Sequence, residues 1–375
     1  MKILFTGGGT GGHFYPIIAV AEAIHKIVKE KRLLPPSLYY MADEPYDSRM
    51  LFDNNIKFVS MPAGKIRRYF SLTNIYDFFK TAVGVIKSLW KIFRIYPDVI
   101  FGKGGYASFP ALFAGKLFRI PIVIHESDSM PGRVNLWAGK FAQDIAVSFP
   151  EAARYFPPDK TAYTGNPLRH AILNPDISGA HEFFKIEKSI PTILILGGSQ
   201  GSSIINETIL EILPALVERF QIIHQTGKNN FTEVSKTSSV ILAKNPYKDR
   251  YKVFDYLNDL GMKMAAGVTA LVISRAGSTI FEIAAWGLPS IIIPIGKAVS
   301  HDQTKNAFNY ARSGAAVVIE EANLAPHILL SEINNLMDNS ERLRQMREST
   351  KSFARADSAE IIALKLLEIG LSHEV

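Results

Sequence analysis

Residues 2–13 read KILFTGGGTGGH: an apolar run passes directly into a glycine-rich turn, and a helix-length segment follows. This order is typical of the first strand, turn and helix of a parallel α/β domain. Residues 193–201, ILILGGSQG, repeat the same order in the second half of the chain. The sequence therefore predicts two domains that each begin with a strand, a glycine turn and a helix.

Short apolar runs alternate with helix-length segments along the chain, which predicts two doubly wound parallel sheets. Prolines and turn residues cluster at 157–167, and we place the domain boundary there. The expected domains are 1–164 and 165–349, and a terminal amphipathic helix at about 350–375 can pack back on the first. Expected strands lie near 2–6, 37–42, 56–60, 98–101, 121–125, 144–148, 192–196, 220–224, 251–254, 270–274, 290–294 and 315–318.

The composition excludes several classes of protein. None of the 375 residues is cysteine, so disulfides, thiolate zinc sites, iron–sulfur clusters and cysteine nucleophiles are ruled out, and a reducing cytoplasm is the expected compartment. The uncharged, largely apolar run at 283–296 is shorter than the roughly eighteen residues that a membrane-spanning helix needs, and it contains two prolines. No Asp-x-Asp sequence and no metal-ligand spacing occur, so we expect neither a metal nor another cofactor.

The positive charge lies in one half of the chain. The formal charge is +8 for residues 1–165 and −1 for residues 166–375, which makes the total of +7. Such an asymmetry indicates an anionic partner for the first half: a membrane surface, a nucleic acid or a phosphorylated substrate. No nucleic-acid-binding motif accompanies the charge, so we expect no nucleic acid.

The first glycine turn has two interpretations. Its backbone N–H groups and the helix that follows favour a phosphate. Gly7, Gly9 and Gly12 also match the spacing Gly-x-Gly-x-x-Gly, so a nicotinamide or flavin oxidoreductase is an open alternative. Against it, the candidate acid after the second strand, Asp43, lies about thirty residues on rather than about twenty. Glycines present only for tight strand–helix packing are the third possibility.

A further glycine cluster, GKGGY at 102–106, follows another apolar run. Successive backbone N–H groups in such a turn favour an anion, and Lys103 adds a positive charge beside them. We therefore predict that Gly104, Gly105 and Tyr106 contact a diphosphate-bearing ligand.

Two side chains are candidates for catalysis. His13 lies where the first glycine turn meets its helix, so it can act as a general base near neutral pH, or it can help to cap the helix. His125 and Glu126 end another expected strand. Glu126 can orient a catalytic base, or the pair can be a hydrogen-bonding group at the end of the strand.

In the second half, residues 274–282 again pass from a strand through glycine into a helix. Gly277 and Thr279 can donate hydrogen bonds to phosphate, and Glu282 can accept hydrogen bonds from the hydroxyls of a ribose. Alternatively, Glu282 completes a capping box with Thr279. The polar run at 301–306 can bind sugar hydroxyls or can be a solvated helix start.

Residues 65–96 combine apolar side chains at helical spacing with a strong excess of lysine and arginine. A basic helix with tryptophan and phenylalanine on its apolar side can lie in the surface of an anionic membrane. The alternative is an ordinary helix that buries its apolar face on the sheet. Peripheral membrane contact and packing on the sheet are thus two hypotheses of equal weight for this segment.

Seven motifs, in order and across nearly the whole chain, resemble those of the MurG family of peptidoglycan N-acetylglucosaminyltransferases. They are GGTGGH at 8–13, GGY at 104–106, HE at 125–126, GNPLR at 165–169, GGSQG at 197–201, RAG at 275–277 and EIAA at 282–285.

The resemblance implies a GT-B fold, in which two Rossmann-like domains face each other across a cleft. It also implies inverting transfer of N-acetylglucosamine from UDP-N-acetylglucosamine to the C4 hydroxyl of undecaprenyl-pyrophosphoryl-MurNAc-pentapeptide (lipid I), forming lipid II at the cytoplasmic face of the plasma membrane. Another GT-B enzyme of UDP-N-acetylglucosamine, such as a 2-epimerase, is the alternative.

The resemblance also implies roles for individual residues. His13 is the favoured base. From the first domain, donor or acceptor would be contacted by Thr10, Gly11, Gly12 and Asn135. The nucleotide sugar would be held by Arg169, Ser199, Leu257, Ser278, Thr279, Glu282 and Gln303, with the Leu257 backbone on uracil and Glu282 on ribose.

Overall fold

The structure is a computed structural model that describes residues 1–64, 73–198, 201–296 and 302–372. It divides into two compact units. Unit 1 comprises Met1–Arg169 together with the chain from Arg355 onward, and unit 2 comprises His170–Ala354.

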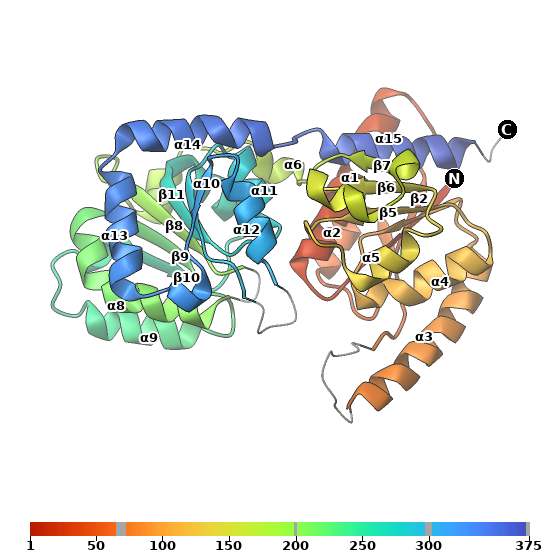
Figure 1. Cartoon of the computed structure of the whole chain (residues 1–375), viewed down its shortest axis with the longest axis horizontal. Coiled ribbons are helices and arrows are strands. Elements are labelled where there is room, and N and C mark those ends of the chain that lie inside the picture. Colours follow the sequence, from red (N-terminus) through yellow and green to blue (C-terminus); the bar gives the residue numbers. More distant parts are fainter. Residues whose placement is uncertain (65–72, 199–200, 297–301, 373–375) are drawn as a thin grey trace. The chain divides into compact units, whose positions relative to one another are not determined.

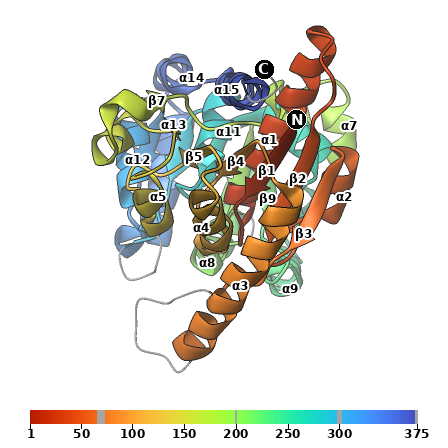
Figure 2. The ribbon, with the colours of Figure 1, turned by 90° about the vertical axis from the view of Figure 1, so that its right-hand side faces the viewer.

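Unit 1 is built on a parallel sheet of seven strands in the order β3-β2-β1-β4-β5-β6-β7 (Figures 1 and 2). The strands are β1 (Lys2–Thr6), β2 (Ser37–Ala42), β3 (Ile56–Ser60), β4 (Val99–Gly102), β5 (Ile122–Glu126), β6 (Asp144–Val147) and β7 (Thr161–Tyr163). Strand order reverses between β1 and β4, since β2 and β3 lie on one side of β1 and the later strands lie on the other. In open parallel sheets, ligands bind at the carboxyl ends of the strands at such a switch point.

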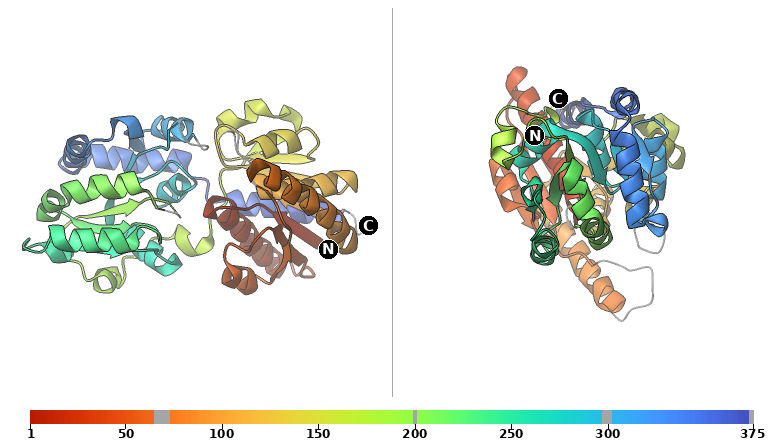
Figure 3. Two further views of the ribbon diagram at one scale, coloured as in Figure 1. Left: turned by 90° about the horizontal axis from the view of Figure 1, so that it is seen from below. Right: turned by 90° about the vertical axis from the view of Figure 1, so that its left-hand side faces the viewer.

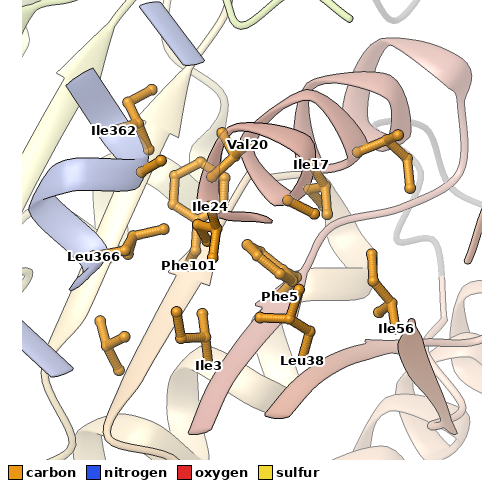
Figure 4. Packing of buried hydrophobic residues seen from close by; sticks show 14 of the residues in the cluster. Ile3, Phe5, Ile17, Val20, Ile24, Leu38, Ile56, Phe101, Ile362 and Leu366 are labelled. Atoms are coloured by element: carbon orange, nitrogen blue, oxygen red, sulfur yellow. The ribbon is translucent and has the colours of Figure 1, made fainter. Parts of the chain in front are cut away.

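The core of unit 1 contains the first and last helices of the chain. Ile17 and Ile24 of α1 (Gly11–Glu30) pack over Phe5 of β1, and Ile362 and Leu366 of α15 (Ser358–Leu371) join the same cluster (Figure 4). The terminal helix is therefore part of unit 1. The remaining helices of unit 1 are α2 (Ser48–Asp53), α3 (Thr73–Ile95), α4 (Phe109–Leu117) and α5 (Arg133–Ala138), with 3-10 turns η1 (Tyr106–Ser108), η2 (Pro150–Tyr155) and η3 (Pro158–Lys160).

Unit 2 has a parallel six-stranded sheet in the order β10-β9-β8-β11-β12-β13, with helices on both faces (Figure 3). Its strands are β8 (Thr192–Leu196), β9 (Gln221–Gln225), β10 (Tyr251–Phe254), β11 (Thr269–Ser274), β12 (Ser290–Ile292) and β13 (Ala316–Val318). Its switch point lies between β8 and β11. Its helical segments are α6 (His170–Leu173), α7 (Ala180–Phe184), α8 (Ser203–Arg219), α9 (Phe231–Ile241), η4 (Lys248–Arg250), α10 (Asp259–Val268), α11 (Thr279–Ala285), α12 (Thr304–Ala311), η5 (Glu321–Asn323), α13 (Pro326–Met337) and α14 (Ser340–Phe353).

The prediction of two doubly wound parallel domains is confirmed, and each predicted strand is present within about two residues of its expected bounds. One strand, β7, was not predicted. It has three residues and lies inside the proline-rich segment where we expected the domain boundary. Gly165 and Asn166 in that segment are buried. The carbonyl of Gly165 accepts a hydrogen bond from Ser358 Oγ at 2.8 Å, which ties the segment to the start of α15.

Candidate active site

Two glycine turns meet at the switch point of unit 1. One connects β1 to α1, and the other connects β4 to η1. Gly105 has φ +79° and ψ 161°, a conformation that only glycine adopts readily. A Cβ placed on Gly105 would lie 3.0 Å from the carbonyl oxygen of Gly8 and 3.4 Å from Nε2 of His13. A Cβ on Gly9 would likewise lie 3.3 Å from the Tyr106 ring, so glycine is what permits the two turns to touch.

His13 lies in the first turn of α1, and its Nδ1 is 3.0 Å from the hydroxyl of Thr10. Thr10 is the N-cap residue of α1, but its side chain makes no capping hydrogen bond. The Thr10 hydroxyl therefore holds the imidazole from one side, while Nε2 lies against Gly105 of the other glycine turn. Gly11 and Gly12 form the backbone between Thr10 and His13.

Glu126 ends β5 beside these turns, and both of its carboxylate oxygens accept hydrogen bonds. Oε1 accepts from the N–H of Asp128 at 2.9 Å, and Oε2 accepts from the N–H of Gly132 at 3.0 Å and from Asn135 Nδ2 at 2.9 Å. Asn135 also donates to the carbonyl of His125 at 3.0 Å. Glu126 thus fixes the loop after β5 and the amide of Asn135, which supports the interpretation of Glu126 as a hydrogen-bonding group at the end of the strand.

Several ionisable groups of this cluster are buried. Burial raises the pKa of Glu126, and the charge of Asp128 raises it further, while its hydrogen bonds and Lys103 oppose the shift. Burial lowers the pKa of Lys103, and the charges of Glu126 and Asp128 oppose that shift. Burial and the charge of Lys103 lower the pKa of His125 well below its ordinary value, so His125 is neutral at physiological pH.

In unit 2 the switch point also carries two turns. Gly198 and Gly201 of the turn after β8 have φ values of +86° and +81°. Ser202 follows them as the N-cap of α8 and accepts a hydrogen bond from Arg275 Nη2 at 2.7 Å. Arg275 Nη1 forms an ion pair of 2.5 Å with Glu321 of η5. Arg275 therefore connects its own loop after β11 to the N-terminus of α8 and to η5.

The structure brings most of the residues expected on the nucleotide sugar to the carboxyl end of the unit 2 sheet. Ser278, Thr279 and Glu282 lie at the start of α11 and are half-buried. Gln303 lies close by, because its Nε2 is 3.4 Å from a Cβ placed on Gly277. The N-cap residue of α11 is Ser278 rather than Thr279, and the Ser278 side chain makes no capping hydrogen bond.

Two other expected residues, Leu257 and Arg169, have contacts of their own outside this group. The N–H of Leu257 donates to Gln225 Oε1 at 2.9 Å, which occupies the donor of its backbone. Arg169 belongs to unit 1, where it is buried with its guanidinium 3.9 Å from the centroid of the Tyr15 ring. Ser199 lies outside the described residues. The roles of all these residues stay predictions.

Helix α3 presents a surface that the sequence left undecided. Among its residues from 77 onward, Gly84, Ser88 and Ile92 are buried, and a Cβ on Gly84 would collide with the carbonyl of Pro62. Most of the large apolar side chains therefore point away from the sheet, and the helix projects beyond it (Figures 1 and 2). We call Phe78, Phe79, Val83, Ile86, Trp90 and Phe93, which are 46–68% exposed, the α3 apolar face.

Basic side chains flank this face: Lys87 is exposed, and Arg94 lies 4.7 Å from the centroid of the Trp90 ring. The first part of the predicted segment, 65–72, lies outside the described residues. Of the described helices, none combines the length and the apolar character needed to cross a bilayer.

The environments of Lys103 and Arg275 could not be predicted from the sequence. Lys103 was interpreted as a charge beside a ligand, whereas its side chain is buried. Arg275 was assigned no role. The sequence carries no signal for its ion pair, because Glu321 is far away in sequence and belongs to a short 3-10 turn.

Comparison with known proteins defines the class. Residues 3–147 match the glycosyltransferase family 28 N-terminal domain, and residues 192–362 match the glycosyltransferase family 28 C-terminal domain. The chain therefore belongs to glycosyltransferase family 28, as its motifs indicated.

A curated relative from Bacillus anthracis is UDP-N-acetylglucosamine–N-acetylmuramyl-(pentapeptide) pyrophosphoryl-undecaprenol N-acetylglucosamine transferase 2. It is 37% identical over 342 residues, which cover 91% of this chain and 92% of the relative. The crystal structure of Acinetobacter baumannii MurG has a TM-score of 0.71 at 24% identity and covers 98% of this chain and 99% of its own. The crystal structure of a putative UDP-N-acetylglucosamine 2-epimerase from Listeria monocytogenes has a TM-score of 0.70 at 15% identity and covers 99% of this chain and 97% of its own. These likenesses confirm the predicted GT-B class of fold.

Proposed function

We propose that this chain transfers N-acetylglucosamine from UDP-N-acetylglucosamine to the C4 hydroxyl of undecaprenyl-pyrophosphoryl-MurNAc-pentapeptide, forming lipid II. The Bacillus anthracis relative carries this donor and this acceptor in its name. The observation that carries the proposal is the contact between the two glycine turns of unit 1, with His13 held between Thr10 and Gly105.

His13 is the general base of the proposed reaction. With Nδ1–H donating to the Thr10 hydroxyl, Nε2 is the basic nitrogen and can take the proton of the attacking hydroxyl. The oxygen then forms a bond to the anomeric carbon as the bond to UDP breaks, and the configuration inverts. Backbone N–H groups at Gly104 and Gly105 would hold the diphosphate of the acceptor.

Unit 2 holds the donor in this proposal. Thr279 and Ser278 at the start of α11 are suited to the phosphates, and Glu282 is suited to the ribose hydroxyls. Since the N–H of Leu257 is already bound by Gln225, its carbonyl oxygen is the backbone group that would contact uracil. Gln303 lies beside Gly277 and would contact the same nucleotide sugar.

The test compares His13→Ala with His25→Ala, a control on the same helix whose Nε2 bonds the carbonyl of Asn54. We expect His13→Ala to lower kcat by about 100-fold or more, with the Kd for UDP-N-acetylglucosamine unchanged. Transfer of radiolabelled N-acetylglucosamine to a short-chain lipid I analogue measures kcat, and calorimetry measures the Kd. An unchanged kcat removes His13 from the mechanism, and conversion of UDP-N-acetylglucosamine without acceptor identifies an epimerase instead.

We also propose that the enzyme binds the cytoplasmic face of the plasma membrane through the α3 apolar face. Exposed aromatic and aliphatic side chains beside lysine and arginine suit the surface of an anionic bilayer. Ile86→Glu should abolish cosedimentation with phosphatidylglycerol vesicles, because it places a charge among the side chains that would enter the bilayer. Val240→Glu, an equally exposed apolar position on α9 of unit 2, should not. Equal binding of both variants would refute this membrane contact.

A further inference from the structure

Lys103 is a charged side chain in the interior of unit 1. It is 1% exposed, and among the described residues its Nζ has no hydrogen-bond partner. A buried ammonium without hydrogen bonds is costly unless an opposite charge lies near it. The compensation for Lys103 therefore has to come from neighbouring carboxylates.

The sheet supplies such a neighbour. Strands β4 and β5 pair in parallel with Gly102 opposite Ile124, so Lys103 and Glu126 follow at the same carboxyl edge of the sheet. Glu126 is itself only 4% exposed. The charged groups that face Glu126 are Lys103 from the turn after β4 and Asp128 from its own loop. The neighbouring His125 is neutral.

The ionisation state of Glu126 decides what it can hold. A carboxylate can accept all three hydrogen bonds described above, from Asp128, Gly132 and Asn135, whereas a protonated carboxyl turns one acceptor site into a donor. Asn135 would then lose part of its anchor. Its amide lies directly against the second glycine turn, because Nδ2 is 2.8 Å from a Cβ placed on Gly104.

We propose that Lys103 is a positioning residue, whose buried ammonium favours the carboxylate form of Glu126, the form that holds Asn135 and the loop at 128–132 against the Gly104–Gly105 turn. This goes beyond a contact of Lys103 with the ligand, and its consequence for catalysis rests on the proposed transferase function.

The test that does not need activity is a titration of Glu126 by NMR. The protein is labelled with 13C at the glutamate carboxyl carbon, and Glu126→Gln identifies the signal. In Lys103→Met, the pKa of Glu126 should lie above that of the wild type, because the opposing positive charge is gone. Lys140→Met, an exposed lysine of the same unit, should leave it unchanged. An unmoved Glu126 pKa in Lys103→Met would overturn the proposal.

The kinetic test separates positioning from direct binding. Lowering the pH should reduce kcat/KM for the lipid acceptor in both proteins, and in Lys103→Met the fall should begin at a higher pH than in the wild type. The double variant Lys103→Met/Glu126→Gln should match Glu126→Gln, since the effect of Lys103 passes through Glu126. A pH-independent rise in acceptor KM would show instead that Lys103 binds the diphosphate. If the wild type transfers no sugar, the proposed function fails, while the NMR titration still tests the pair.

Discussion

Gly105→Ala is the substitution whose effect follows most directly from the structure. At φ +79° and ψ 161° an alanine backbone is strained by about 1–3 kcal/mol. This should lower Tm by roughly 2–10 °C for a unit of this size. The new methyl carbon would also lie 3.0 Å from the carbonyl oxygen of Gly8, which has to move by a few tenths of an ångström, and 3.4 Å from Nε2 of His13, at the limit of ordinary van der Waals contact. A misplacement of about 1 Å can cost about 100-fold in rate. Because Gly8 belongs to the turn that leads to His13, this smaller shift should lower kcat by roughly 2- to 10-fold.

The matched control is Gly179→Ala in unit 2. Gly179 has φ +73° and ψ −4°, and a Cβ placed on it meets no atom within 4 Å. That variant should lose about 1 kcal/mol of stability and no activity. Transfer to a lipid I analogue below the melting temperature of both variants gives kcat, and UDP-N-acetylglucosamine titration gives the donor Kd, which neither variant should change. Equal kcat in both variants would refute the contact between the glycine turns as the basis of catalysis.

Three further substitutions test separate parts of the structure. Thr10→Val should lower kcat about tenfold by releasing His13, whereas Thr10→Ser should retain activity; equal kcat values would show that the hydroxyl has no role. Trp286→Phe removes the indole donor that bonds the Ile172 carbonyl at 2.7 Å, so urea unfolding should show a loss of about 1–3 kcal/mol with kcat unchanged. Burial lowers the pKa of His224 to about 3, so the unfolded chain binds a proton at pH 5 that the folded chain does not. Above about pH 6.5, His224 is mostly neutral in both states and has little effect on stability. At pH 5, protonation of His224 in the unfolded chain lowers the free energy of unfolding by about 2 kcal/mol. Urea unfolding at pH 8 and pH 5 should show this loss in the wild type and a smaller one in His224→Gln.

The fold could be predicted from the sequence because its strands are short apolar runs bounded by glycine and proline. The runs at 2–6 and 192–196 match β1 and β8 at both ends. Another expected strand, at 290–294, is shorter in the structure, where β12 ends at Ile292. Pro294 lies just beyond it and has no N–H to donate to a neighbouring strand. The three residues of β7 were too few to give a periodic signal.

The parts of the candidate site that could be predicted are those fixed by adjacency in sequence or by the order of parallel strands. The glycine turns and His13 are adjacent in sequence, and parallel strand order brings the turns after β1 and β4 together. The burial of Lys103 was not predictable, because lysine is rarely buried and its partner Glu126 lies on another strand. The outward direction of the α3 apolar face was also hidden. The helix packs through Gly84 and Ser88, which a hydrophobic pattern does not mark as core positions.

The α3 apolar face also bears on which GT-B enzyme this is. The solved transferase and the solved epimerase share this fold almost equally, so the fold cannot separate them. An enzyme that converts a free nucleotide sugar gains nothing from a row of exposed aromatic side chains such as Trp90 and Phe93, which promote aggregation unless a partner covers them. An enzyme whose acceptor is anchored in a bilayer gains a high local concentration of that acceptor. Ile86→Glu should therefore lower transfer to lipid I in vesicles while leaving transfer to a soluble short-chain analogue intact. An equal loss of transfer with both acceptors would show that the α3 apolar face does not act by binding the membrane.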